Sequence, residues 1–205
     1  MGDEVSKQGE KMNAIPTKYR GRNYRSRLEA RWAAFFDMVG WTYEYEPIDF
    51  NGWIPDFAII GKEVLFVEVK PVFHCAESVF VKAARAIKGT NYQCNEVLLL
   101  GCTVFNWMDC VSIGWLGENL LSLPDYDLEE EGHFFSINNA ICTREKSSIG
   151  LSHCSGSYVD RISGRYTGSL IGADSWMISE HWQKSGNPTQ WKPVLENRLP
   201  PFPGR

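Results

Sequence analysis

The sequence predicts an α/β fold in which helices pack against a mixed central sheet. Apolar residues in the segment 25–39 recur at helical spacing, whereas the segments between 41 and 70 alternate as half-buried strands do. A second helical segment and a short apolar run, suited to a buried strand, follow before residue 102. The expected order is therefore helix, three strands, helix, strand, or αβββαβ. With 205 residues, 43% of them hydrophobic, the chain has enough material for one packed core and an appended region.

The first predicted helix carries a continuous apolar stripe. Its members recur three or four residues apart, and they are Leu28, Trp32, Phe35, Phe36 and Val39. We expect the helix to end at Gly40, because glycine readily adopts the left-handed conformation that closes many helices. The segment 41–46 then alternates aromatic and polar residues as a strand does, and Pro47 ends it.

The remaining elements of the core follow the same reasoning. They are strands at 54–60, 64–70 and 96–100, and a helix at 77–88. A turn-prone stretch around Asn51 and Gly52 precedes the first of these strands, and Gly61 separates the first two. Gly89 ends the helix. The first three strands of the core are thus expected to form a meander.

The chain outside this core is expected to be less regular. We divide it into a flexible arm at 1–17, the core at 18–102, an irregular region of short strands and loops at 103–170, and a helix with a Pro-rich tail at 171–205. The final helix is expected at about 173–184, because Gly186 and Pro188 follow it. Beyond Cys102, isolated tryptophans among glycines and serines favour short strands.

Composition indicates the compartment. The first eleven residues are polar and charged and contain no apolar stretch, so we expect a cytoplasmic protein without membrane association, in the host cytoplasm if a phage encodes it. The six cysteines lie at scattered spacings, which favours reduced thiols over a disulfide framework. No two cysteines are separated by only two residues, as in common zinc sites. We therefore do not expect a zinc site, and one built from His133, Cys142, His153 and Cys154 is the remaining alternative.

The formal net charge of −4 conceals a local basic stretch. Between Lys18 and Arg31 the chain carries many cations and a single acid, Glu29. Basic residues near an acidic site favour contact with phosphates, although a solvated helix face is the ordinary alternative. The candidate nucleic-acid contacts are Arg20, Arg22, Arg25, Arg27 and Arg31, with Lys82 on the second helix.

The candidate chemistry lies on two neighbouring strands. Residues two apart on a strand share a face, so Glu68 and Lys70 point the same way while Val67 and Val69 point to the other side. A neighbouring strand that brings Asp56 alongside would place two carboxylates and an ammonium near one hard cation. We expect Asp56 and Glu68 to hold Mg²⁺, for which Mn²⁺ can substitute, together with the main-chain carbonyl of Val69.

Two further residues complete the expected site. Phosphodiester hydrolysis requires an in-line water and neutralisation of charge in the transition state. Lys70 would orient that water and stabilise the negative charge on the phosphate. Glu29 lies at the edge of the apolar stripe of the first helix, where it would bind a metal through water or a second ion. Arg25 precedes it on the same side and would meet the phosphates of the scissile strand.

These residues resemble a known family. The stretches at 19–32, 43–47, 53–57 and 68–71 are similar to small phage and mobile-element members of the PD-(D/E)xK nuclease superfamily. The resemblance covers about residues 18–102. It implies the restriction-endonuclease-like fold, divalent-metal hydrolysis of DNA, and catalytic roles for Glu29, Asp56, Glu68 and Lys70.

Other functions remain open from the sequence. Taken singly, Glu29 is an ordinary helix-surface acid and Asp56 an ordinary turn residue. The same fold also serves as a scaffold, so a non-catalytic nucleic-acid-binding or protein-binding module is the main alternative. An RNA nuclease is a third, since no base-reading element or aromatic RNA-binding signature is present to separate DNA from RNA. A homodimer is compatible with an enzyme that cuts both strands.

Overall fold

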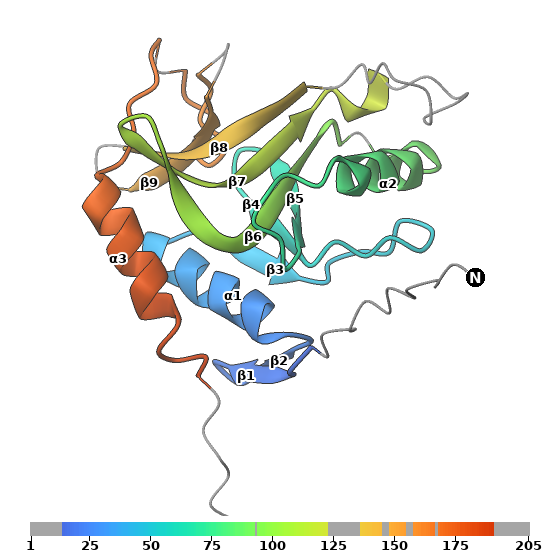
Figure 1. Ribbon diagram of the computed structural model, residues 1–205. Coiled ribbons are helices and arrows are strands. Elements are labelled where there is room, and N and C mark those ends of the chain that lie inside the picture. The colour runs from blue at the N-terminus through green and yellow to red at the C-terminus, as the bar shows by residue number, and fades with distance from the viewer. Residues whose placement is uncertain are drawn as a thin grey trace, which may run out of the picture.

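A computed structural model describes residues 14–190 except 93, 123–135, 145–147, 155–157 and 167. The described chain is mixed α/β, with a seven-stranded mixed sheet and three α-helices (Figure 1). Most of the expected N-terminal arm and the Pro-rich tail lie outside the described residues. Among the described residues, no helix is long and apolar enough to cross a membrane.

The elements follow one another in two groups. The first group comprises β1 (Thr17–Tyr19), β2 (Arg22–Tyr24), α1 (Arg27–Val39), β3 (Tyr43–Tyr45), β4 (Phe57–Ile60), β5 (Val64–Val69), α2 (Glu77–Lys88) and β6 (Glu96–Trp107). The second comprises β7 (Cys110–Glu118), a short 3-10 helix (Leu120–Ser122), β8 (Ser136–Arg144), β9 (Ile149–His153) and α3 (Ser175–Ser185). Strands β1 and β2 form a separate hairpin, and β3 to β9 form the large sheet in chain order.

The large sheet is antiparallel except at its centre. Strands β5 and β6 are parallel, with Val67 level with Leu98. A parallel pair requires a long crossover connection, and α2 provides it. The αβββαβ order that the sequence predicts is therefore confirmed as an order of elements.

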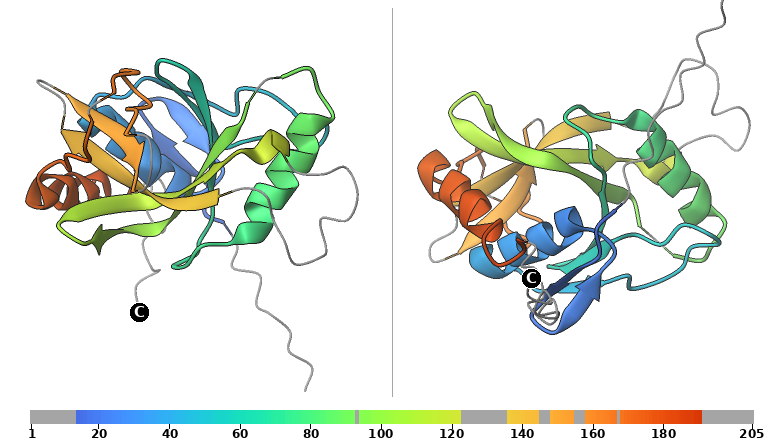
Figure 2. Two further views of the ribbon diagram at one scale, coloured as in Figure 1. Left: turned by 90° about the horizontal axis from the view of Figure 1, so that it is seen from above. Right: turned by 60° about the horizontal axis from the view of Figure 1, so that its bottom comes forward.

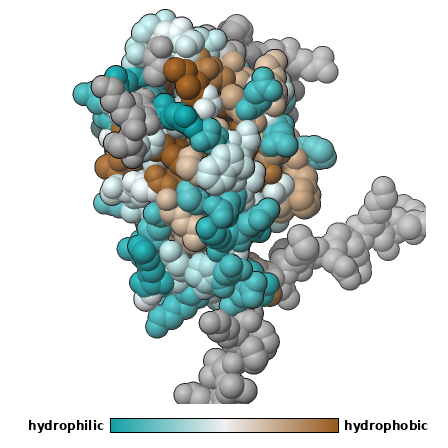
Figure 3. Space-filling model, turned by 90° about the vertical axis from the view of Figure 1, so that its left-hand side faces the viewer, coloured by the Kyte–Doolittle hydropathy of each residue, from teal (hydrophilic) through white to brown (hydrophobic). Residues whose placement is uncertain are grey.

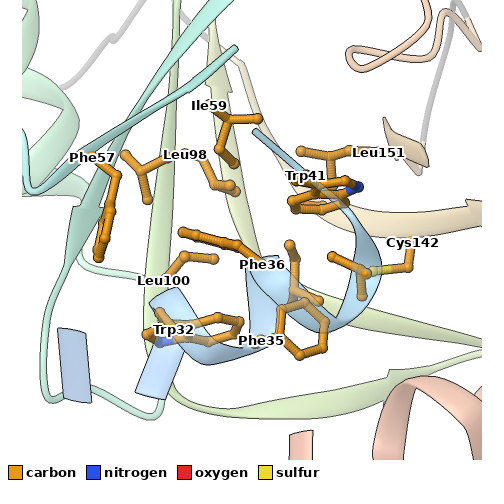
Figure 4. Packing of buried hydrophobic residues seen from close by; sticks show 14 of the residues in the cluster. Trp32, Phe35, Phe36, Trp41, Phe57, Ile59, Leu98, Leu100, Cys142 and Leu151 are labelled. Atoms are coloured by element: carbon orange, nitrogen blue, oxygen red, sulfur yellow. The ribbon is translucent and has the colours of Figure 1, made fainter. Parts of the chain in front are cut away.

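The core has one layer on each face of the sheet. Helices α1 and α3 cover one face of the sheet (Figure 1). Val67 and Val69 of β5 belong to the core on this face, together with the residues labelled in Figure 4. Helix α2 covers the other face, where Phe66 packs (Figure 2). The alternation along β5 separates these two sets, because successive side chains of a strand point to opposite faces. The same alternation decides which face of the sheet each site residue occupies.

The C-terminal helix α3 packs against α1. The rings of Trp182 and Trp32 lie 4.3 Å apart between centroids, and the Ala173 amide donates to the Cys142 carbonyl just before α3 begins. Trp176, on the same helix, is 69% exposed. Figure 3 shows the side of the molecule that carries α3, where hydrophilic and hydrophobic residues are intermingled. Trp182 thus belongs to the core, whereas Trp176 lies on the surface.

Several boundaries differ from those expected. Helix α1 begins at Arg27 rather than residue 25, because Ser26 adopts an extended conformation as its N-cap. Strand β4 begins at Phe57 rather than residue 54, since Phe50 and Trp53 pair in a turn just before it. Strand β3 spans only Tyr43–Tyr45 of the predicted segment 41–46. Helix α3 begins at Ser175, two residues later than expected.

The region beyond Cys102 is more regular than its sequence suggests. The expected boundary at 102 falls inside β6, and β7 to β9 extend the same sheet. Strand β7 is buried on both faces, so its sequence does not alternate. A Cβ at Gly114 would come within 2.1 Å of the Leu99 carbonyl oxygen, and one at Gly117 within 2.4 Å of the Phe80 ring. These glycines allow close packing inside the strand, where glycine in sequence usually signals a turn.

Candidate metal and phosphate site at the end of β5

The candidate site lies where β4 begins and β5 ends. Phe57 is level with Val67 across this antiparallel pair, so the next step brings Asp56 level with Glu68. The Val69 amide donates to Asp56 Oδ2 at 2.7 Å, which fixes the carboxylate at the strand end. Both acids are buried, with exposed fractions of 4% for Asp56 and 6% for Glu68. The structure therefore brings together the two carboxylates that the sequence analysis paired.

Glu68 is held from two sides. Its Oε1 lies 2.5 Å from Lys70 Nζ, as the shared strand face predicts. Its Oε2 accepts a hydrogen bond of 3.0 Å from the indole Nε1 of Trp53, which is itself buried. The sequence analysis did not anticipate Trp53. A tryptophan three residues before the first acid is an available donor, but only the turn that pairs Phe50 with Trp53 aims it at Glu68.

Arg25 is part of the site. Its Nη2 lies 2.5 Å from Asp56 Oδ1, and its Nε lies 2.8 Å from Glu46 Oε1. The side chain is 53% exposed, so the guanidinium joins the buried acid to the surface. Burial lowers the pKa of Arg25, but the charge of Asp56, the hydrogen bond with Tyr45 and the charges of Glu46 and Glu29 together outweigh it, so the net pKa lies above the ordinary value. Sequence reasoning placed Arg25 near the phosphates and missed both of its acidic partners.

Glu29 forms a hydrogen-bonded cap at the start of α1. Its Oε1 accepts from the Ser26 hydroxyl at 2.7 Å, while the Glu29 amide donates to Ser26 Oγ at 3.1 Å. Its Oε2 accepts from the Tyr45 hydroxyl at 2.6 Å and from the Arg25 amide at 3.1 Å. This is a reciprocal cap at the start of α1, and the pattern of Ser26 with a glutamate three residues later is its sequence signal.

Glu29 is thus engaged in the cap, although its charge still acts on Asp56. Within the described ranges, no three His, Cys, Asp or Glu side chains lie close enough together to hold a metal. Helix α1, which carries Glu29, covers one face of the sheet, whereas Glu68 shares the opposite face with Phe66. The expected role of Glu29 through water or a second ion stays a prediction, and it would require the present hydrogen bonds of Glu29 to break.

The cap gives a direct stability prediction. Replacing Ser26 with alanine removes the acceptor of the Glu29 amide and the donor to its carboxylate, so we expect the free energy of unfolding to fall by about 1 kcal/mol. Urea denaturation at pH 7 measures this change. Alanine at the exposed Ser148 is the matched control and should be neutral. Equal costs at both positions would contradict the capping role.

The other expected nucleic-acid contacts divide into two groups. Arg20, Arg22, Arg27 and Lys82 are exposed, although Arg20 pairs with Asp37 at 3.2 Å. Arg31 points to α3, where its guanidinium lies 3.8 Å from the centroid of the Trp182 ring and donates to the Trp182 carbonyl at 2.9 Å. Burial lowers its pKa. A side chain held in this way joins two helices, and the expected contact of Arg31 with nucleic acid stays a prediction.

The charges around Asp56 are unbalanced. Burial raises the pKa of its carboxyl from 3.8 to about 7, and the charges of Glu68 and Glu29 act in the same direction. The Val69 amide and the Lys70 ammonium oppose this increase. Ionised Asp56 therefore lies in an environment with too little positive charge, which a bound cation would relieve.

The donor set fits one class of ion. Extended backbone points the N–H and C=O of a residue to the same side, and the Val69 amide points to Asp56, so the Val69 carbonyl also faces this acid. Two carboxylates and a carbonyl match Mg²⁺, which is usually bound through one or two carboxylates and retains several waters. Zinc requires at least three protein ligands of a softer kind, and His133 of the alternative zinc site lies outside the described residues.

The arrangement combines oxygen ligands for a hard cation with two cationic side chains that reach the surface. Lys70 is 43% exposed and Arg25 is 53% exposed. Such a set can hold a divalent ion and a phosphate together. Comparisons with known proteins supply no further identification, since no protein-family model, no curated protein and no solved structure matches this chain.

Proposed function

We propose that the protein is a Mg²⁺-dependent nuclease of the PD-(D/E)xK superfamily that hydrolyses phosphodiester bonds in DNA, with β3 to β6, α1 and α2 as a restriction-endonuclease-like core. The observation that carries the proposal is the level placement of buried Asp56 and Glu68 beside Lys70. The sheet order and the parallel β5–β6 pair are consistent with such a core.

Each residue has a defined task in this proposal. Asp56 and Glu68 hold Mg²⁺ through their carboxylates, and Val69 contributes its main-chain carbonyl. Bound Mg²⁺ supplies charge neutralisation at the phosphate and a more reactive water at neutral pH. The Val69 amide and the Trp53 indole hold the two acids in place before the ion binds.

Lys70 and Arg25 act on the substrate. In the structure each is paired with a carboxylate of the site, and each extends to the surface. When the carboxylates bind the ion, these cations become available for the phosphate. Lys70 then stabilises the charge that develops during attack, and Arg25 positions the scissile strand.

A cleavage assay tests the proposal. Purified protein is incubated with single-stranded, duplex and branched DNA, and with RNA, in Mg²⁺, in Mn²⁺ or in EDTA. We expect cutting of DNA in both metals, none in EDTA, and none by Lys70→Ala. Cutting of RNA alone would assign the protein as an RNA nuclease. The absence of metal-dependent cutting on every substrate would reject the enzyme in favour of a binding module on this scaffold.

The raised pKa of Asp56 predicts how metal binding depends on pH. Mg²⁺ binds the ionised carboxylate, and a proton competes with it below a pKa of about 7. The apparent dissociation constant should therefore fall about tenfold per pH unit below 7 and level off above pH 8. Calorimetric titration with Mg²⁺ from pH 5.5 to 8.5 measures this dependence. A constant affinity across the range would contradict the assigned role of Asp56.

Trp53 is predicted to position Glu68. Replacing it with phenylalanine keeps a buried ring but removes the Nε1 donor 3.0 Å from Glu68 Oε2. Partners that orient a metal ligand typically contribute 10- to 100-fold in metal affinity, so we expect a loss of roughly this size. Mg²⁺ titration measures it, with Trp115→Phe as the control of the same chemistry on β7. Unchanged affinity in Trp53→Phe would show that the indole donor is dispensable.

A further inference from the structure

We propose that the groove between α2 and the turn at 51–53 binds one strand of the nucleic acid, through contacts of its phosphates with Lys82 and Arg85. This inference rests on the proposed function and names the path by which the substrate reaches its site. It differs from the sequence expectation, in which the basic stretch from Lys18 to Arg31 provides most of the contacts.

The groove has a volume of about 730 Å³. In Figures 1 and 2 the loop that leads into β4 runs beside α2. Residues of this loop and of α2 line the groove. Val81 and Ala86 supply apolar surface beside the largely buried Trp53, and Lys82 and Arg85 supply positive charge. Near Gly89, whose carbonyl accepts from Asn51 Nδ2 at 3.4 Å, the turn and the helix come together.

The two cations are suitably placed for a phosphate backbone. Lys82 and Arg85 are exposed and lie three residues apart on α2, which puts them on one side of the helix about 5–6 Å apart between Cβ atoms. Among the residues that the structure describes, neither forms an ion pair with an acid. Glu77 is the one acid that lines the groove, at the start of the helix. Side chains without an internal partner lose no ion pair when they bind phosphates.

The groove adjoins the candidate site through Trp53. This residue lines the groove and also donates its indole hydrogen bond to Glu68, so one side chain separates the bound strand from a metal ligand. Glu68 shares the face of the sheet that α2 covers, whereas α1 begins on the opposite face. A strand that enters along α2 therefore approaches the site from the side on which Glu68 lies.

Two cations of the basic stretch from Lys18 to Arg31 already have partners in the structure. Arg20 is paired with Asp37, and Arg31 is held against Trp182 of α3. Apolar surface beside a cationic rim suits the sugars and bases of an unpaired strand better than the evenly charged outside of a duplex, because stacking on apolar surface requires exposed bases. The occupant to which these features point is thus a single strand.

Salt-dependent binding tests the inference. The wild-type chain, Lys82→Ala/Arg85→Ala and the charge-matched control Lys62→Ala/Lys184→Ala are titrated in EDTA with labelled 20-nucleotide DNA, its duplex, and RNA of the same sequence. Lys62 and Lys184 are exposed and lie away from the groove. Two lost phosphate contacts should lower the slope of log affinity against log salt by about 1.4 for single strands, and weaken binding roughly 10- to 30-fold at 0.1 M salt.

The outcomes separate this inference from the proposed function. Equal losses in both double variants, no loss in either, or no binding of nucleic acid by the wild type would overturn the groove assignment. A loss confined to duplex DNA would overturn the single-strand occupant. If the wild type cuts no substrate but its binding depends on Lys82 and Arg85, the groove assignment stands and the nuclease proposal fails. If the wild type cuts and Lys82→Ala/Arg85→Ala leaves the salt slope unchanged, the nuclease proposal stands and the groove assignment fails.

Discussion

Replacing Asp56 with asparagine is expected to lower kcat/KM for cleavage by about 10³-fold or more. Asparagine keeps the shape and the acceptor for the Val69 amide but removes the charge that holds the cation. Metal ions supply several kcal/mol of transition-state stabilisation, and about 4 kcal/mol corresponds to a factor of 10³ in rate. Single-turnover cleavage at saturating Mg²⁺ measures the change, with Asp109→Asn in the exposed β6–β7 turn as the matched control.

The same substitution should stabilise the metal-free protein at pH 8. The folded-state pKa of Asp56 is raised to about 7, so its protonated form stabilises the fold below pH 4, and this contribution is lost as the pH rises through 7. Neutral asparagine has no such cost. We expect a rise in Tm of at least 2–4 °C, the shift that about 1 kcal/mol produces in a chain of this size. A lower Tm would mean that Asp56 is structural, and a loss of activity would then not identify a ligand.

Replacing Trp32 with alanine is expected to cost about 3–5 kcal/mol of unfolding free energy. Trp32 is fully buried between α1, α3 and the sheet, with its ring centroid 4.3 Å from that of Trp182 and 5.4 Å from that of Phe35. Its Nε1 also donates to the Gly101 carbonyl at 2.9 Å, so the substitution leaves both a cavity and an unpaired acceptor.

Urea denaturation, followed by circular dichroism, measures this loss. The control is Trp176→Ala, which removes the same side chain from an exposed position on α3 and should change stability by less than about 0.5 kcal/mol. Similar effects at the two positions would contradict the packing of α3 on α1.

The part of the site that depends on one strand was predictable from sequence. Side chains alternate between the two faces of β5, so Val67 and Val69 lie on one face and Glu68 on the other. The structure has this alternation, with a packed layer covering each face of the strand. The pairing of Asp56 with Glu68 was also predictable, since a short turn between two strands brings their ends level. These inferences required only local geometry.

The remaining partners depend on contacts between distant segments. Arg25 reaches Asp56 because the β1–β2 hairpin and the start of α1 are placed beside β4, which no spacing in the sequence encodes. Trp53 reaches Glu68 only through its turn. The cap that Glu29 forms with Ser26 was predictable, because a serine three residues before a glutamate is its sequence signal, but the sequence analysis did not include it.

The extent of the sheet was harder to predict than its centre. Strands β6 and β7 carry glycines at positions where backbone or ring atoms pack closely, such as Gly114 and Gly117. A glycine in a sequence can mark either a turn or a position where other atoms pack closely against the backbone. The glycines after Cys102 therefore suggested loops. Only the packing of Phe80 and Leu99 against these positions distinguishes the two cases.

Calorimetric titration of Mg²⁺ at pH 8 tests the central claim most directly, using the wild type, Asp56→Asn, Glu68→Gln and the surface control Glu180→Gln. Two carboxylates that share one ion must both contribute, so we predict that Asp56→Asn and Glu68→Gln each weaken Mg²⁺ binding at least about tenfold, while Glu180→Gln binds as the wild type does. Wild-type affinity in either Asp56→Asn or Glu68→Gln would contradict a shared ion at the end of β5.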